Sequence, residues 1–176
     1  MEWDAIIIGG GAAGLWAAGT AAARGRTLVI EKNIKPGVKI LMSGGTRCNI
    51  THHCDVGGIV EAFGIQGRFL KHALHQLPPA EVVAEIERLG VPTKVEDTGK
   101  VFPVSNHAID VRDALVRRLT AAGAQLRSGV AVRNVAPNVE GGWKVQLDEA
   151  ELLTHKVILS TGGLSYSACG TTGDGY

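Results

Sequence analysis

Three glycines near the start of the chain have the spacing of a phosphate-binding turn. Gly9, Gly11 and Gly14 follow an apolar run and open an alanine-rich one, which is the context that makes a G-x-G-x-x-G pattern informative. The first glycine would allow a tight bend, the second would let a pyrophosphate approach the backbone, and the third would let helix and strand pack closely. Ala12 and Ala13 would then offer the free amides of a helix N-terminus to the phosphates.

An acidic residue stands where a nucleotide ribose needs one. Glu31 ends a second apolar run about twenty residues after the glycines, and a carboxylate there can accept hydrogen bonds from the hydroxyls of adenosine ribose. Lys32 follows it directly. The charge of Glu31 disfavours a 2'-phosphate, so NADP is not expected at this site and FAD or NAD remain. The alternative is a glycine-rich turn in an unrelated α/β protein.

A second group of polar residues and glycines follows. Lys39 precedes it, and its members are Ser43, Gly44, Gly45, Arg47, Cys48 and Asn49. Backbone amides and side chains of these kinds can wrap an anionic or heteroaromatic group. An NAD site needs no such second loop, whereas a flavin and its ribityl chain need support beyond the pyrophosphate. By itself the same group would be compatible with a plain surface turn.

Small residues also follow the last apolar run of the chain. Thr161, Gly162 and Gly163 come at its end, and Asp174 lies in the closing segment GTTGDGY. Small residues at a strand end let a cofactor approach the backbone, and an aspartate can bind a ribityl or ribose hydroxyl. A structural turn is the alternative. No acid or base stands out as catalytic, so the catalytic residues remain unassigned.

These groups need a β-α-β unit to position them, and one begins almost at the first residue. We expect a buried strand over residues 4–8, a helix over 12–24, a second buried strand over 27–30 and then a long irregular, functional stretch over 33–58. Further expected elements are helices over 68–77, 79–89 and 108–122, a hairpin of 92–96 and 100–104, and strands over 125–127, 131–135, 143–147 and 151–159. The predicted fold class is α/β: a Rossmann-like FAD-binding domain with a central parallel sheet, helices and an antiparallel crossover β-meander.

Composition indicates an ordinary globular protein and argues against several function classes. The chain has 176 residues, of which 45% are hydrophobic and 20% charged, enough for one well-buried domain. Its net charge of +1 provides no global basic field, so we expect no nucleic-acid partner and disfavour an FAD enzyme that modifies tRNA. No apolar run is long enough for a bilayer and the N-terminus is no secretory signal, so we expect a cytoplasmic protein without a membrane partner.

The cysteines and histidines do not predict a metal site. Cys48, His52, His53 and Cys54 lie close together, but their spacing matches no common zinc arrangement. No CxxC pair accompanies Cys48, which argues against a redox thiol. We therefore expect no metal.

Three segments resemble those of bacterial FAD-binding flavoproteins of the aminoacetone oxidase and 3-dehydro-bile-acid reductase-like family: SGGTRCNIT, GKVFPVSNHAIDVRDAL and STGGLSYSACGTTGDGY. The resemblance covers essentially the whole chain and extends more distantly to fumarate reductase flavoproteins and other glutathione-reductase-like folds. It implies a non-covalently bound FAD, with the SGGTRCN loop along the pyrophosphate and towards the flavin. The residues it implies for the pocket are Gly9, Gly11, Gly14 and Glu31 on the ADP half, the backbone near Val132 at adenine, and Thr161, Gly162 and Asp174 completing it.

The resemblance has two departures and implies a function. Thr46 stands where the family usually has a third glycine. Family members are considerably longer, so we expect residues 1–176 to be an incomplete FAD-binding domain. The implied function is an FAD-dependent oxidoreductase that carries out NAD(P)H-linked redox chemistry on a small organic substrate. A single-site NAD-binding protein and a truncated, non-catalytic nucleotide-binding remnant are the alternatives, and the oligomeric state is not predicted.

Overall fold

The computed structural model describes residues 2–165, 172–173 and 175. The chain divides into two compact units. Unit 1 consists of Met1–Ile40 and Leu115–Tyr176, and unit 2 consists of Leu41–Ala114. The expectation that residues 1–176 form one incomplete FAD-binding domain stays a prediction.

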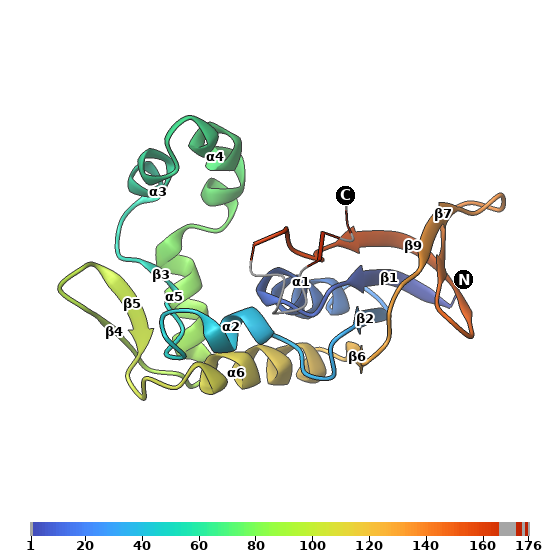
Figure 1. The fold of residues 1–176 in the computed structure, drawn as a ribbon, viewed down its shortest axis with the longest axis horizontal. Helices are drawn as coiled ribbons and strands as arrows, with labels where there is room; N and C mark the ends of the chain where they lie inside the picture. Colours follow the sequence, from blue (N-terminus) through green and yellow to red (C-terminus); the bar gives the residue numbers. More distant parts are fainter. Residues whose placement is uncertain (1, 166–171, 174, 176) are drawn as a thin grey trace. The chain divides into compact units, whose positions relative to one another are not determined.

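Unit 1 is built on one six-stranded sheet. Its strands, in spatial order, are β6 (Gln125–Ser128), β2 (Thr27–Glu31), β1 (Trp3–Ile8), β9 (Glu151–Leu159), β8 (Trp143–Gln146) and β7 (Asn134–Pro137). The first four pair in parallel, whereas β8 pairs antiparallel with both β9 and β7 (Figure 1). The predicted central parallel sheet with an antiparallel meander is therefore confirmed.

The core of unit 1 follows from the continuous apolar runs in its central strands. Strands that are covered on both faces lack polar alternation, and accordingly Ile6, Ile7 and Leu28 are fully buried. Helix α1 (Ala12–Ala22) joins β1 to β2 and contacts both. Its residues Leu15 and Ala18 are fully buried, so α1 packs closely and its N-terminus is held at the end of β1.

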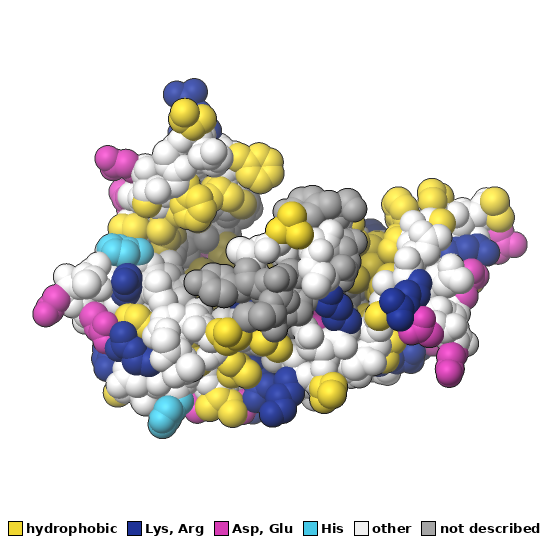
Figure 2. All heavy atoms as spheres, in the orientation of Figure 1, with side chains coloured by type: hydrophobic (Ala, Val, Ile, Leu, Met, Phe, Trp, Pro, Cys, Tyr) yellow, Lys and Arg dark blue, Asp and Glu magenta, His cyan; other side chains and the backbone are white. Residues whose placement is uncertain are grey.

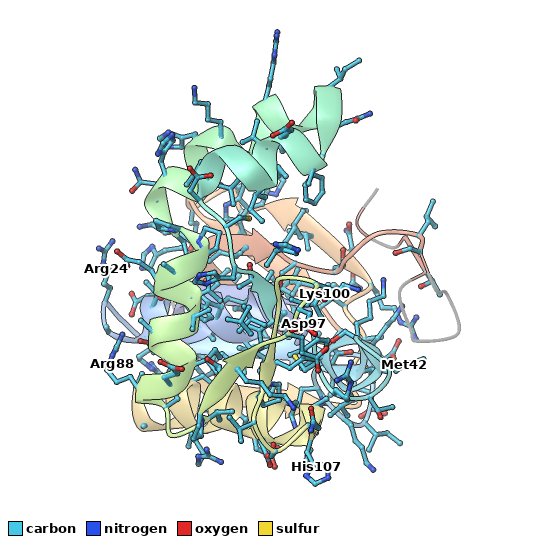
Figure 3. The ribbon with its side chains drawn as sticks, turned by 90° about the vertical axis from the view of Figure 1, so that its left-hand side faces the viewer. Arg24, Met42, Arg88, Asp97, Lys100 and His107 are labelled. Atoms are coloured by element: carbon cyan, nitrogen blue, oxygen red, sulfur yellow. The ribbon has the colours of Figure 1, made fainter. Side chains whose placement is uncertain are left out.

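Unit 2 combines short helices with a three-stranded antiparallel sheet of order β3-β5-β4. The strands β4 and β5 form the predicted hairpin, in which Asp97 and Lys100 are labelled in Figure 3. The elements are β3 (Thr51–His52), α3 (Val56–Ala62), η1 (Gly64–Gln66), α4 (Gly67–Gln76), α5 (Pro79–Arg88), β4 (Thr93–Val95) and β5 (Lys100–Pro103). Helices α2 (Val38–Met42) and α6 (Ala108–Ala121) contribute residues to both units.

Two expectations about local structure are wrong. The stretch 33–58 is not irregular throughout, because it contains α2, β3 and the start of α3. Helix α3 is glycine-rich, but Asp55 caps it by accepting the amide of Gly58 at 2.8 Å, and such a cap supports a helix of low propensity. The strand expected over 131–135 begins only at Asn134, because Gly129 has a left-handed φ of 74° and its amide donates to Asn33 O, which turns the chain before strand pairing starts.

The surface in view carries charges of both signs. Figure 2 shows acidic and basic side chains interspersed over this face, in keeping with 18 basic and 17 acidic residues. Within the described ranges, no helix combines the length and the hydrophobicity needed to cross a membrane.

Candidate functional site

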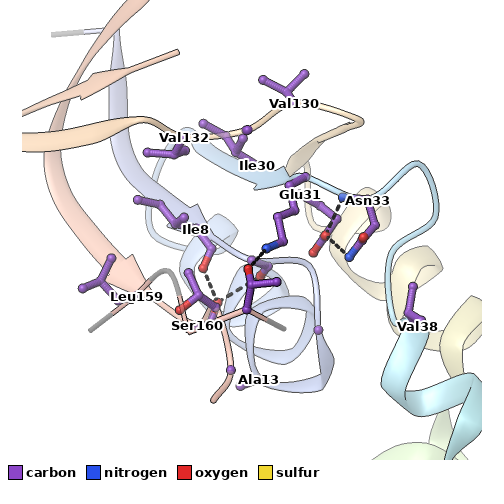
Figure 4. A pocket seen from close by; sticks show the side chains of 18 of the residues that line it. Ile8, Ala13, Ile30, Glu31, Asn33, Val38, Val130, Val132, Leu159 and Ser160 are labelled. Atoms are coloured by element: carbon purple, nitrogen blue, oxygen red, sulfur yellow. Dashed lines mark hydrogen bonds between the residues drawn. The ribbon is translucent and has the colours of Figure 1, made fainter. Parts of the chain in front are cut away.

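A cavity of about 890 Å³ lies at the carboxyl ends of the parallel strands of unit 1 (Figure 4). It is lined by Ile8 at the end of β1, by Glu31 at the end of β2 and by Leu159 at the end of β9. Ligands of open α/β sheets bind at this edge. The volume lies in the upper part of the range of about 300–1,000 Å³ that is usual for cofactor pockets.

The glycine turn presents an uncapped helix N-terminus to this cavity. Gly9 has a φ of 104°, and a Cβ there would collide with the backbone of Ser160. Gly11 is the N-cap of α1 without a side-chain capping bond, and a Cβ built on it meets nothing within 4 Å. The amides of Ala12 and Ala13 have no acceptor within the helix by the geometry of its first turn. An anion approaching Gly11 would therefore find open space, free donors and the positive end of the helix dipole.

The carboxylate of Glu31 is held in place by three N–H groups. Its Oε2 accepts the amide of Gly10 at 2.6 Å, and its Oε1 accepts the backbone and side-chain amides of Asn33 at 2.8 and 2.7 Å. Only 7% of Glu31 is exposed. These donors offset the desolvation of the charged group, and they fix its oxygens beside the glycine turn.

The remaining walls come from separate segments of unit 1. Val132 and its neighbours form one wall after β6, and two lysines bring positive charge to the cavity. Lys32 Nζ donates to Thr172 Oγ1 at 2.6 Å, and Lys39 Nζ donates to the exposed Ser165 Oγ at 3.3 Å. The hydroxyl of Ser160 shares its proton between the carbonyl oxygens of Ile8 and Gly9, at 3.0 and 2.9 Å, which joins the end of β9 to the turn.

The structure brings together many of the site residues that the sequence predicts. Those that line the cavity are Gly9, Gly11, Ala12, Ala13, Glu31, Lys32, Lys39, Val132, Thr161 and Gly162. Gly14 lies behind the turn, where a Cβ would collide with Gly9 O, so its role in the structure is packing. Gly163 is not among the lining residues, and Asp174 lies outside the described residues. Asn33 and Ser160 line the cavity but were not predicted, although a polar residue two positions after Glu31 is a usable signal.

The second predicted loop belongs to unit 2, and its backbone has a defined conformation. Gly44, Gly45, Thr46 and Cys48 all have a left-handed φ, of 57°, 66°, 69° and 65°. The amide of Cys48 donates to Ser43 O at 3.0 Å. None of the residues predicted here, Ser43, Gly44, Gly45, Arg47, Cys48 and Asn49, is among those that line the cavity of unit 1. Their contact with a cofactor stays a prediction.

The side chain of Arg47 is engaged within unit 2. Its Nη1 lies 2.5 Å from Glu96 Oε1, and its guanidinium stacks 4.1 Å from the ring centroid of Phe102. Both partners belong to the segment of the β4–β5 hairpin. Arg47 therefore ties the loop to this hairpin, and a cofactor contact would have to share a guanidinium that already has two partners.

The side chain of Cys48 is buried in this loop, with only 5% of the residue exposed. Burial raises the pKa of its thiol, while a hydrogen bond with Ser43 opposes that rise. The thiol is therefore protonated at neutral pH and a poor nucleophile. In the described part of the chain, no three His, Cys, Asp or Glu side chains gather as a metal site would require, and the expected absence of a metal stays a prediction.

Replacing Thr46 with glycine is expected to stabilise the protein by about 1 kcal/mol, because a left-handed φ of 69° is unfavourable for a residue that carries a Cβ. The gain is the relief of that strain, less the entropy that a glycine adds to the unfolded chain and the hydrogen bond from Thr46 Oγ1 to Gly45 O. Urea unfolding of both proteins measures the change. Thr46→Ala is the control, since it removes the hydroxyl but keeps a Cβ and should not stabilise. An equal gain in both variants would show that backbone strain is not the cause.

The chain matches one protein family over nearly its whole length. Residues 3–176 match the family described as HI0933-like protein Rossmann domain. The chain is 32% identical to the ribosomal RNA dihydrouridine synthase of Escherichia coli over 99% of this chain and 43% of that protein. It is 30% identical to the 3-dehydro-bile acid delta(4,6)-reductase of Clostridium scindens over 97% of this chain and 41% of that protein. The chain thus spans less than half the length of these relatives.

Solved structures share the fold at low sequence identity. The 3-ketosteroid-delta4-(5alpha)-dehydrogenase of Rhodococcus jostii superposes with a TM-score of 0.65 at 16% identity, over 93% of this chain and 46% of that one. The quinol fumarate reductase FrdA of E. coli also reaches 0.65, at 17% identity over 93% and 33% of the two chains. The family assignment supports FAD as the cofactor. The resemblance noted from the sequence is confirmed, and the chain belongs to the HI0933-like family through its Rossmann domain.

Proposed function

We propose that unit 1 binds the ADP half of FAD and that the chain is the flavin-binding part of an oxidoreductase. The observation that carries the proposal is the uncapped N-terminus of α1 at Gly11, which faces the cavity with Glu31 at the adjoining strand end. A pyrophosphate requires close backbone approach and free amides, and a ribose requires an acceptor a short distance away. The two requirements meet in one cavity.

The chemistry of the lining residues fits this ligand. Gly11 offers space for a phosphate, since a Cβ there would touch nothing. Lys32 and Lys39 add positive charge near the anion, which complements the diphosphate. The apolar side chains of Ile30, Val130 and Val132 line the same cavity and would pack against the adenine ring. A single NAD would satisfy the same groups, but the family assignment favours FAD.

The proposed reaction is reduction of a small organic substrate, with NAD(P)H as the electron donor. Bound FAD would supply the hydride or electron transfer, and this chain would supply binding and orientation. The names of two relatives state different substrates, ribosomal RNA in one and a bile acid in the other. The family therefore does not single out one substrate class. The near balance of 18 basic and 17 acidic residues favours a small substrate over RNA.

The visible absorption spectrum of the purified chain tests the cofactor. We expect the protein, mixed with FAD and freed of unbound ligand, to retain the flavin absorption bands in proportion to its concentration. Titration with NAD(P)H would then test the electron donor, because reduction bleaches the long-wavelength flavin band. A protein that stays colourless but binds NAD with a measurable heat would favour the single-site NAD alternative. Binding of neither nucleotide would contradict the proposal.

A further inference from the structure

Asn33 connects two walls of the cavity. Its backbone amide and its side-chain amide both donate to Glu31 Oε1, at 2.8 and 2.7 Å. Its carbonyl oxygen accepts the amide of Gly129 at 2.9 Å, and Gly129 begins the segment that carries Val130 and Val132 along the cavity. Asn33 itself is among the lining residues. One residue thus holds both the carboxylate and the segment that carries Val130 and Val132.

The carboxylate of Glu31 has few acceptor positions left for a ligand. A carboxylate offers about four lone-pair positions, two on each oxygen. Asn33 takes both positions on Oε1, and the amide of Gly10 takes one on Oε2 at 2.6 Å. Counting the donors from the described residues, a single position therefore remains, on the oxygen that lies beside the glycine turn.

We propose that Asn33 is a positioning residue that restricts Glu31 to one hydroxyl of the ligand's ribose. The inference rests on the proposed binding of the ADP half of FAD. With Oε1 saturated, either the 2'- or the 3'-hydroxyl bonds to Oε2, and the other hydroxyl does not bond to Glu31. Without the Asn33 amide, Oε1 regains an acceptor position and the carboxylate can accept both hydroxyls. Asn33 therefore determines which ribose hydroxyl the site requires.

Calorimetric titration of the chain with ADP, 2'-deoxy-ADP and 3'-deoxy-ADP tests this role. In the wild type, one deoxy analogue should bind about tenfold or more weakly than ADP, because it lacks a hydrogen bond to a charged acceptor, and the other should bind nearly as well as ADP. In Asn33→Ala the difference between the two analogues should fall to about threefold or less. Asn33→Asp keeps the size but sets a second carboxylate against Glu31 and should weaken all three nucleotides.

A matched control separates positioning from packing. Asn134→Ala removes an amide side chain from the same cavity without touching Glu31, and it should keep the wild-type ratio between the two deoxy analogues. A merely structural role of Asn33 would weaken every nucleotide equally and leave that ratio unchanged. Circular dichroism and thermal melting check that each variant is folded, and if one Asn33 variant unfolds, the other is measured.

The outcomes distinguish this inference from the proposed function. Equal loss for both deoxy analogues in the wild type, or an unchanged ratio in Asn33→Ala, would overturn the role of Asn33 while leaving nucleotide binding intact. A wild-type chain that binds neither ADP nor FAD would overturn the proposed function and this inference together. If both Asn33 variants unfold, the wild type still tests the premise: equal loss for both deoxy analogues would overturn it, and loss for one analogue alone would support it.

Discussion

Gly14→Ala is expected to destabilise unit 1 by about 3 kcal/mol or more, because the methyl group has no room. A Cβ at this position would collide with Gly9 O and would lie 2.7 Å from Ser160 Oγ. Neither can move aside cheaply, since the Ser160 hydroxyl lies within hydrogen-bonding distance of both Gly9 O and Ile8 O, at 2.9 and 3.0 Å. The close approach of α1 to β1 and β9 would be lost. Urea unfolding followed by circular dichroism measures the effect.

Gly19→Ala, in the same helix, is the matched control. Its Cβ would meet the side chain of Arg118 rather than backbone, so the substitution would displace a guanidinium that donates to Trp16 O and Thr20 Oγ1. Alanine favours a helix by about 1 kcal/mol over glycine, which offsets part of that loss. We expect Gly19→Ala to cost clearly less stability than Gly14→Ala. If Gly14→Ala unfolded at the same urea concentration as the wild type, the contact between turn and helix would not limit the stability of unit 1.

Gly11→Ala should have the opposite profile, with an intact fold and FAD binding weakened roughly 100-fold or more, as expected when a bound anion loses about two charge-assisted hydrogen bonds. Gly11 has a φ of −78°, which alanine adopts readily, and its Cβ meets no protein atom within 4 Å. The methyl group would instead occupy the space through which a phosphate reaches the amides of α1. Flavin retention and fluorescence titration measure the binding, and thermal melting without ligand measures the fold.

Comparing Gly11→Ala with Gly14→Ala identifies which side of the turn faces the ligand. If Gly11→Ala bound FAD as tightly as the wild type, the phosphates would not approach α1 at this residue, and the proposed orientation of the ADP half would be wrong. Loss of fold in Gly11→Ala would contradict the open space in front of this position. The pair therefore separates a packing glycine from a binding glycine within one motif.

The sequence predicts the cavity better than it predicts the loops. Gly9, Gly11 and Glu31 were identified from a local pattern of about thirty residues. The pattern consists of a buried strand, the spaced glycines after it and an acidic residue at the end of the next strand. The contribution of Ser160 was not predictable in this way. Its hydroxyl reaches Ile8 and Gly9 across some 150 residues of chain, and such contacts depend on tertiary packing rather than on spacing.

The missed elements have physical reasons of their own. Helix α2 has five residues, too few for a periodic pattern to emerge. In α3 the residues Gly57 and Gly58 have low helix propensity, so the sequence does not indicate a helix there. The structure shows that Asp55 caps this helix. The shift of the expected strand over 131–135 arises because Gly129, with a φ of 74°, turns the chain towards Asn33. The alternation of apolar and polar side chains, from which the strand was predicted, does not indicate such a turn.

The cavity is made from the two ends of unit 1, which are separated in the chain by the whole of unit 2. During synthesis, β1, α1 and β2 leave the ribosome first, but β1 has no partner on its β9 side until residue 159 has emerged. At about 5–20 residues per second, the first half of the nucleotide site waits several seconds for the second. The ability to take up the cofactor is therefore acquired only after the residues of β9 have been made.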